Sequence, residues 1–224
     1  MNMNLIKPMS RRKFLGASAL AAVSAAIAMS PSASRVAFAT STGQASSDLD
    51  ILNYALTLEH LESYAYRLAV GSGLLSGAAL KYFQDFGGHE ATHVTALTDT
   101  IKKLGGTPVA AQASYNLPKF KSQQELLTYF QTVEELGAAA YLGQAPRIQN
   151  PDVLTAAVSI HNVEGQHAAI LSDLIGVTPS PTFGIPKTME QVLAVVTPIL
   201  TGTAMPGMPN TGLGGASTNH FHSK

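Results

Sequence analysis

Four long helical patterns dominate the chain, and no segment alternates apolar and polar residues as a half-buried β-strand would. Each pattern begins at a residue type that caps helix N-termini, Ser or Asn. The chain has 224 residues, of which 46% are hydrophobic and only 12% are charged, so it can bury one ordinary core. The sequence therefore predicts an all-α domain with helices at about residues 48–71, 76–104, 122–145 and 150–176.

The connections between these patterns predict how the helices are arranged. Short links join the first helix to the second and the third to the fourth, so each pair should form an antiparallel hairpin, whereas residues 105–121 form a long crossover. Two hairpins joined by one crossover make a four-helix bundle. We also expect a capping box between Ser122 and Glu125, and either a bend or a close helix contact at Gly87-Gly88.

Residues 1–39 have the features of an export signal. Ser10-Arg11-Arg12-Lys13-Phe14-Leu15 precedes an alanine-rich apolar run, and Ala37-Phe38-Ala39 is a small-x-small cleavage site. The twin arginine resembles the signal that the bacterial twin-arginine translocase reads, and the apolar run is shorter than the roughly 20 residues that span a bilayer. We expect cleavage after Ala39, a periplasmic or secreted protein, and no stable membrane insertion.

Three further segments flank the predicted bundle. Residues 40–47 are predicted to be a linker. Residues 177–201 should form an extension with a short helix at about Thr188–Leu200, cut by Pro198. The Gly- and Pro-rich residues 202–224 are predicted to be a disordered tail.

Charge and composition exclude several classes of protein. Residues 1–39 hold five of the fourteen basic residues and no acidic residue, so the rest carries nine basic against fourteen acidic side chains, a formal charge of −5. The formal net charge of the whole chain, +0, argues against a nucleic-acid partner. The absence of cysteine excludes thiolate metal sites, disulfides and a cysteine nucleophile.

Two Glu-x-x-His motifs indicate the chemistry. They are Glu90-Ala91-Thr92-His93 in the second helix and Glu164-Gly165-Gln166-His167 in the fourth. Residues three apart on a helix project from nearly the same face, so each motif can offer a carboxylate and an imidazole to one metal ion. The other two helices supply Glu59 and the pair Glu134-Glu135. This is the ligand set of dinuclear iron and manganese carboxylate bundles.

The four glutamates are predicted to lie at one level. Glu59 and Glu90 are about 12 and 14 residues from their hairpin turn, or roughly 18 and 21 Å at ~1.5 Å per residue. Glu134 and Glu164 are about 11 and 14 residues from theirs, or roughly 16 and 21 Å. Two divalent ions would balance four buried carboxylates, and oxygen-rich donors with one imidazole per ion suit iron or manganese better than copper.

The segment from about residue 48 to residue 176 resembles the ferritin-like superfamily. The resemblance is best to the exported branch of that superfamily, which includes desiccation-related proteins. In the first ferritin helix the ligand Glu is followed seven residues later by a tyrosine, which corresponds here to Glu59 and Tyr66. The other segments that carry the resemblance are His89–His93, Leu104–Pro108, Glu134–Gly143 and Val163–Ala169. The resemblance implies a dinuclear centre of two iron or manganese ions with these ligands: Glu59, Glu90, His93, Glu134, Glu164 and His167.

Several neighbouring residues have more than one interpretation. The family pattern of a Glu three residues before a Gly favours Glu134 over Glu135, and Glu62 is a candidate extra ligand or proton acceptor. His161 is either an extra ligand, a hydrogen-bond partner of the ligands or a core histidine with its own hydrogen bond, the last being favoured. Tyr66 is a candidate redox tyrosine, although a core role is favoured. The remaining histidines are expected at the surface or without a role: His60, His89, His220 and His222.

Three functions are compatible with these features. The first is a dinuclear metal enzyme that uses dioxygen or peroxide as an oxidase, a peroxide scavenger or a ferroxidase. The second is a metal-binding or iron-handling protein without efficient turnover. The third is a stress-related structural or interaction protein with a residual site. Because the chain beyond the bundle shows no cage-building fifth helix apart from the short segment Thr188–Leu200, we expect a monomer or a dimer.

Overall fold

The computed structural model describes residues 47–178 and 181–202. The predicted signal peptide, nearly all of the predicted linker and the predicted tail from residue 203 lie outside the described residues, as do His220 and His222. All regular secondary structure in the described ranges is helical, so the all-α prediction is confirmed. None of these helices combines the length and the apolar character needed to cross a bilayer.

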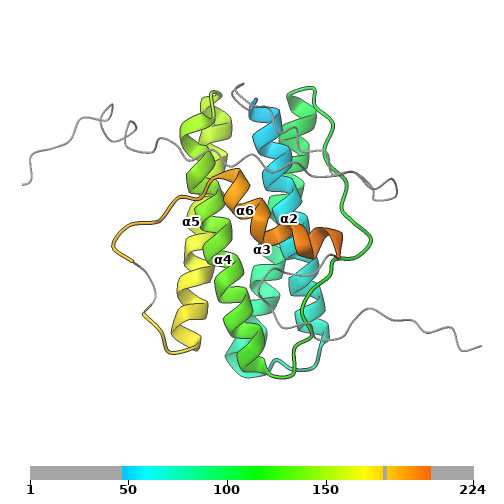
Figure 1. Cartoon of the computed structure of the whole chain (residues 1–224), viewed down its shortest axis with the longest axis vertical. Coiled ribbons are helices and arrows are strands. Elements are labelled where there is room, and N and C mark those ends of the chain that lie inside the picture. The colour runs from blue at the N-terminus through cyan, green and yellow to red at the C-terminus, as the bar shows by residue number, and fades with distance from the viewer. Residues whose placement is uncertain (1–46, 179–180, 203–224) are drawn as a thin grey trace, which may run out of the picture. The chain divides into compact units, whose positions relative to one another are not determined.

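Two antiparallel helical hairpins, α2 with α3 and α4 with α5, form a four-helix bundle, as predicted (Figure 1). Residues 104–122 cross from the first hairpin to the second, and the short 3-10 turn η1 lies between α4 and α5. The elements are α2 (Asp48–Gly71), α3 (Gly77–Lys103), α4 (Gln123–Gln144), η1 (Ala145–Arg147), α5 (Pro151–Leu174) and α6 (Met189–Thr201).

Side-chain caps mark the start of α2, α4, α5 and α6, whereas Ser76 at the start of α3 makes no side-chain cap hydrogen bond. At α2, the Ser47 hydroxyl accepts from the Asp50 N–H at 3.2 Å and the Asp50 carboxylate accepts from the Ser47 N–H at 3.0 Å, a complete capping box. At α4, the Ser122 hydroxyl accepts from the Glu125 N–H at 3.2 Å. A complete capping box would also need the Glu125 carboxylate to accept from the Ser122 N–H. The Glu125 carboxylate instead accepts from the Lys121 N–H, at 2.8 Å.

Gly87 permits a close contact between α3 and α2. A Cβ at this position would lie 3.2 Å from Tyr66 Cβ, which is tighter than ordinary packing. The helical assignment of α3 is continuous through Gly87 and Gly88. Of the two alternatives expected there, the structure shows the close contact.

Two apolar clusters fill the two ends of the bundle and leave a polar layer between them. On α2 the first cluster ends at Leu56 and the second begins at Ala65, so Glu59 and Glu62 lie between them. The second cluster is aromatic and includes Phe83, Phe86 and Phe130. The apolar layers above and below therefore exclude water from any polar group held at this level.

Helix α6 lies across α2 and α4 (Figure 1) and shares a third apolar cluster with them. The helix continues through Pro198 to Thr201, so the prediction that Pro198 cuts it is wrong. Proline removes one N–H, whose helical acceptor would be the carbonyl of Ala194, an exposed residue that water can reach. Burial of Val196, Pro198 and Ile199 against the bundle offsets that loss.

Candidate metal centre

Six of the side chains singled out from the sequence meet in the polar layer at the middle of the bundle. The structure places all of their carboxylates and imidazoles inside, with exposed fractions of 0% for each glutamate and 9% or less for each histidine. Each of the four helices contributes at least one of them, as expected from the levels counted along the helices. They are Glu59 on α2, Glu90 and His93 on α3, Glu134 on α4, and Glu164 and His167 on α5.

These side chains form two overlapping groups. Within each group the potential ligand atoms, one per residue, all lie within 4.8 Å of one another. Glu90 and Glu164 belong to both groups, so each of these two carboxylates is shared between them. The first group is Glu59, Glu90, His93 and Glu164, and the second is Glu90, Glu134, Glu164 and His167.

Each histidine directs its Nδ1 atom at several carboxylates simultaneously. His93 Nδ1 lies 3.0 Å from Glu90 Oε2, 3.2 Å from Glu59 Oε2 and 3.4 Å from Glu164 Oε1. His167 Nδ1 lies 3.2 Å from Glu90 Oε1 and 3.2 Å from Glu134 Oε2. A single N–H cannot donate well to two or three oxygens, whereas one metal ion can accept from all of these atoms.

Three carboxylate oxygens in the centre lack a hydrogen bond. They are Glu90 Oε1 and both oxygens of Glu164, each buried from solvent. Each buried polar group left without a hydrogen bond lowers the stability of the fold by about 1–3 kcal/mol, and by more when the group is charged. The orphaned atoms belong to the two glutamates that both groups share, which is where two cations would supply the missing interactions.

Burial and mutual repulsion perturb the carboxylates. Burial, aided by the charges of Glu134, Glu90 and Glu59, raises the pKa of Glu164 well above its usual range. Burial also raises the pKa of Glu59 to about 8, although a hydrogen bond with His93 acts against it. The centre without cations therefore holds protons that metal ions would displace.

The pKa values of the two histidines are raised, whereas burial alone lowers the pKa of a histidine. Burial acts to lower the pKa of His93, but hydrogen bonds and charges from Glu59 and Glu90 outweigh it and raise the pKa to about 10. The same balance, with Glu134 and Glu90, raises the pKa of His167 to about 9. Burial acts to raise the pKa of Glu90, but the imidazoles of His167 and His93, whose Nδ1 atoms lie 3.2 and 3.0 Å from its oxygens, lower it to about 2.

A tyrosine holds each of the two unshared glutamates. The Tyr66 hydroxyl donates to Glu134 Oε1, and the Tyr141 hydroxyl donates to Glu59 Oε1 at 2.5 Å. Both rings are buried, and burial raises the pKa of each phenol well above its usual range. Tyr66 was a candidate from the sequence, whereas Tyr141 was not. A signal was present, because Tyr141 follows Glu134 by seven residues as Tyr66 follows Glu59.

His89 is a second residue that sequence reasoning missed. It is exposed, as expected, but its Nδ1 lies 2.9 Å from His167 Nε2 and the two rings stack with centroids 5.2 Å apart. His89 therefore holds the outer nitrogen of His167 while the inner nitrogen faces the carboxylates, an arrangement that orients metal-binding imidazoles. The position next to Glu90 was the available signal.

The structure separates the remaining alternatives by position. Glu134 points into the centre and Glu135 is exposed. His161 is half-buried with its Nδ1 2.9 Å from the Ala138 carbonyl oxygen, and His60 Nε2 lies 3.2 Å from the Val109 carbonyl oxygen, so neither enters the two groups. Glu62 is 5% exposed and lies beside the centre, outside both groups.

Gly137 on α4 makes room for two of these carboxylates. A Cβ at this position would lie 2.9 Å from Glu164 Oε2 and 3.2 Å from Glu62 Oε1. Any larger residue would push Glu164 away from its shared position. The Glu134–Gly137 spacing thus has a steric explanation.

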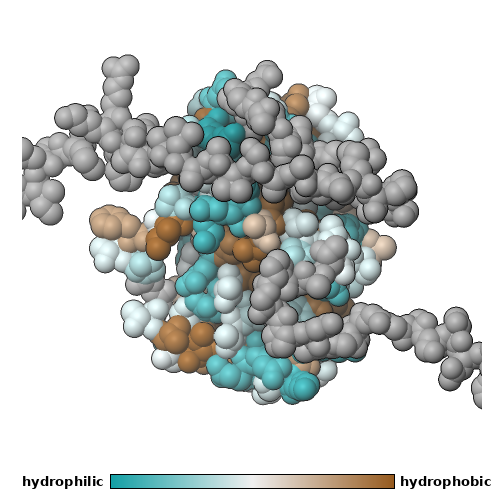
Figure 2. All heavy atoms as spheres, in the orientation of Figure 1, coloured by the Kyte–Doolittle hydropathy of each residue, from teal (hydrophilic) through white to brown (hydrophobic). Residues whose placement is uncertain are grey.

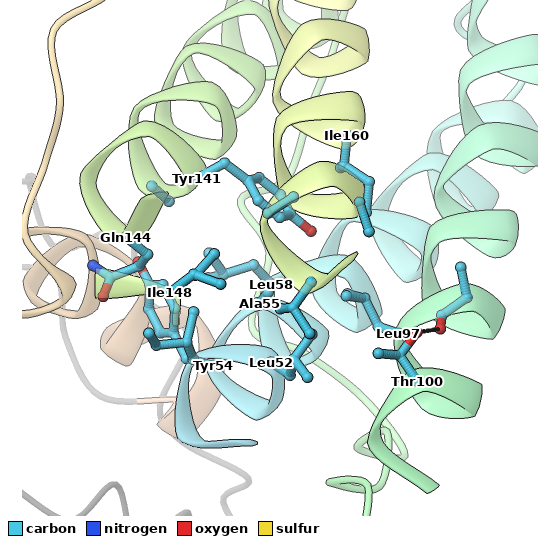
Figure 3. Close-up of a pocket in the computed structure, with 16 residues that line it drawn as sticks. Leu52, Tyr54, Ala55, Leu58, Leu97, Thr100, Tyr141, Gln144, Ile148 and Ile160 are labelled. Carbon is cyan, nitrogen blue, oxygen red and sulfur yellow. Dashed lines mark hydrogen bonds between the residues drawn. The ribbon is translucent and has the colours of Figure 1, made fainter. Parts of the chain in front are cut away.

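An apolar cavity of about 40 Å³ lies near the centre, towards the start of α2 (Figure 3). Leu52, Ala55 and Leu58 of α2 face Leu97 of α3 across it, and Tyr141 lines it as well. Because the Tyr141 hydroxyl bonds to Glu59, this ring stands between the cavity and the carboxylates. Apolar cavities of this kind stay dry and admit small apolar molecules.

Replacing Tyr66 by Phe is expected to lower the unfolding free energy of the metal-free protein by about 1–3 kcal/mol, since the buried Glu134 carboxylate loses a donor. Denaturant unfolding in the presence of a chelator measures the change. Tyr82→Phe, in the same aromatic cluster, is the matched control and should change stability by less than about 0.5 kcal/mol. Equal losses in the two variants would contradict the role of the Tyr66 hydroxyl.

Comparison with known proteins gives the same fold. A conserved hypothetical protein from Mycobacterium tuberculosis superposes with a TM-score of 0.54 at 21% sequence identity, covering 61% of this chain and 95% of that one. A ferritin-like, diiron-carboxylate protein from Bacillus anthracis superposes with a TM-score of 0.50 at 21% identity, covering 57% of this chain and 94% of that one. No curated protein matches the sequence.

The family model for the ferritin-like domain matches residues 47–177, which include all four bundle helices and every member of the two groups. The predicted ferritin-like bundle is therefore confirmed, and its buried Glu and His side chains are compatible with a dinuclear metal site. The chain belongs to the family of ferritin-like domain proteins.

Proposed function

We propose that the protein binds two iron or manganese ions in the centre and uses them for redox chemistry with dioxygen or peroxide, as an oxidase, a peroxide scavenger or a ferroxidase. The observation that carries the proposal is the pair of overlapping groups that share Glu90 and Glu164. Glu59 and His93 would complete one ion's ligands, and Glu134 and His167 the other's.

The donor set and its charge fit two divalent ions. Four glutamates supply four negative charges, which two divalent cations balance inside a layer closed by apolar clusters. One imidazole for each ion, with oxygen for the rest, favours iron or manganese. The name of the Bacillus anthracis structure, a diiron-carboxylate protein, supports iron.

Two redox-active ions held by shared carboxylates would supply the electrons that reduce dioxygen or peroxide. The chain's own residues set the conditions for that chemistry. Tyr66 and Tyr141 hold the two unshared carboxylates in place, and His89 orients His167. The apolar cavity beside Tyr141 offers a dry space for a small apolar molecule such as dioxygen.

The decisive experiment compares Glu90→Gln with Glu135→Gln. Because Glu90 belongs to both groups and Glu135 is exposed, Glu90→Gln should weaken metal binding by roughly 100-fold or more while Glu135→Gln binds as the unaltered protein does. Elemental analysis gives the metal content, and an oxygen electrode follows aerobic addition of ferrous iron. Full oxygen consumption by Glu90→Gln would contradict the proposal. Two ions bound per chain without oxygen consumption would leave a metal-binding protein and remove the redox function.

We further propose export by the twin-arginine route, supported by the Arg11-Arg12 pair before the apolar run. Replacing both arginines by lysine keeps the charge and removes the recognised pair. The double variant should accumulate uncleaved in the cytoplasm of a bacterial host, whereas a Lys7→Arg control should reach the periplasm. Cell fractionation shows where each variant is located, and the mass of the product shows whether it was cleaved. Finding the double variant in the periplasm would contradict this route.

A further inference from the structure

An open groove of about 570 Å³ lies between α2, α4, α6 and the crossover. This volume is within the range of small-molecule binding sites, about 300–1,000 Å³. Figure 2 shows apolar surface near the middle of the face that carries α4 and α6. The walls of the groove are mainly apolar and include Leu58, Leu61, Tyr129, Leu136, Val196 and Ile199.

The groove reaches the metal centre at one place. Glu62 and Gly137 both line it. The missing Cβ of Gly137 would lie 2.9 Å from Glu164 Oε2 and 3.2 Å from Glu62 Oε1, so only a glycine separates the groove from a shared carboxylate. A molecule in the groove can therefore bring one end next to the centre.

Glu62 gives this end of the groove its chemistry. Its carboxyl group is buried, lies outside both metal groups and is a fifth acidic group beside the four that two divalent ions would balance. Its carbonyl oxygen accepts hydrogen bonds whether or not the group carries a proton, and it carries no positive charge in either state. An anionic head group is disfavoured there because it would lie beside two acidic groups, Glu62 and Glu164, whereas a hydroxyl group can donate to Glu62.

We propose that the groove binds a neutral aliphatic molecule of the class of medium-chain alcohols, with its hydroxyl at Glu62 and its chain along α4 and α6. Calling this molecule a substrate rests on the proposed dinuclear chemistry. Binding in the groove does not, because it needs no metal ion.

Val195 and Val158 provide a matched pair for testing the groove. Val195 lines it from α6 and is 43% exposed, whereas Val158 lies on α5 outside it and is 49% exposed. Tryptophan at 195 should fill the groove without touching the metal centre. The same substitution at 158 adds an equal apolar surface elsewhere.

The experiment is calorimetric titration of the full chain with 1-octanol, with and without bound metal. We expect one molecule per chain in both states, with a negative heat-capacity change. Val195→Trp should weaken binding at least tenfold, and Val158→Trp should leave it unchanged. Octanoate should bind at least tenfold more weakly than octanol, and Glu62→Gln should reduce that preference.

Four results would overturn the assignment. The first is that octanol does not bind, and the second is that the two tryptophan variants bind it equally well. The third is that octanoate binds as tightly as octanol. The fourth is that Val195→Trp changes the molecular mass in solution, which would make the groove an interface between copies of the chain. Since the titration of metal-free protein is independent of oxygen chemistry, failure of the groove and failure of the proposed redox function are distinguishable.

Discussion

Replacing Glu164 by Gln should raise the melting temperature of the metal-free protein by roughly 5 °C while abolishing metal binding. Glu164 is fully buried, neither of its oxygens makes a hydrogen bond, and burial with three neighbouring carboxylates raises its pKa well above the usual range. A neutral amide of the same shape removes that unfavourable acid, which is worth about 2 kcal/mol. Glu164 also belongs to both metal groups, so the same change removes a ligand from each ion.

Calorimetric melting with chelator, followed by melting and elemental analysis after metal addition, measures both effects. Glu135→Gln is the control, because it makes the same chemical change on an exposed side chain of α4. It should leave melting temperature and metal content unchanged. A metal-free Glu164→Gln protein that melts below the unaltered one would show that the carboxylate stabilises the fold by itself, contrary to the metal-centre interpretation.

The stabilisation by bound metal should increase as pH rises from 6 to 8.5. In the metal-free protein, a group whose pKa is higher in the folded than in the unfolded state contributes fully to stability at pH values below its unfolded-state pKa. That contribution is lost as the pH rises through the folded-state pKa. For Glu59 this interval is from 4.5 to about 8, and for His93 and His167 from 6.5 to about 10 and 9. Within its interval, each of these groups lowers the unfolding free energy of the metal-free protein by up to about 1.4 kcal/mol for each unit that the pH rises.

Metal ions replace these protons, so the loaded protein should not show the same decline. The lowered pKa of Glu90, about 2, acts only at acidic pH and does not enter this window. Melting temperatures with Mn²⁺ and with chelator, measured in parallel at each pH, give the difference directly. Two curves that stay parallel across the range would contradict displacement of protons by metal in this centre.

Local features of the sequence were enough for the helices. Ser47, Ser122 and Asn150 each accept from a backbone N–H within three residues, so the caps depend on neighbours in the chain. Pro198 shows where such reasoning fails. A local rule predicts a break there, but packing of α6 on the bundle, which the local sequence does not contain, keeps the helix intact.

The candidate ligands could also be found from the sequence, because helical spacing alone puts Glu90 with His93 and Glu164 with His167 on one face. The structure adds that the tyrosine contacts are crossed. Tyr66 of α2 bonds to Glu134 of α4, and Tyr141 of α4 bonds to Glu59 of α2, between residues 68 and 82 positions apart. Spacing along one helix carries no information about a partner on another.

The sequence by itself determined the four helices, their pairing into hairpins and the common level of the Glu and His side chains, since caps, periodicity and rise per residue are properties of neighbouring residues. Only the tertiary structure decided which carboxylates are shared, which tyrosine and histidine side chains hold them, and where a groove reaches them. These depend on the distances between helices and on side-chain volumes at their contacts, where one missing Cβ, at Gly137, connects the groove to the carboxylates.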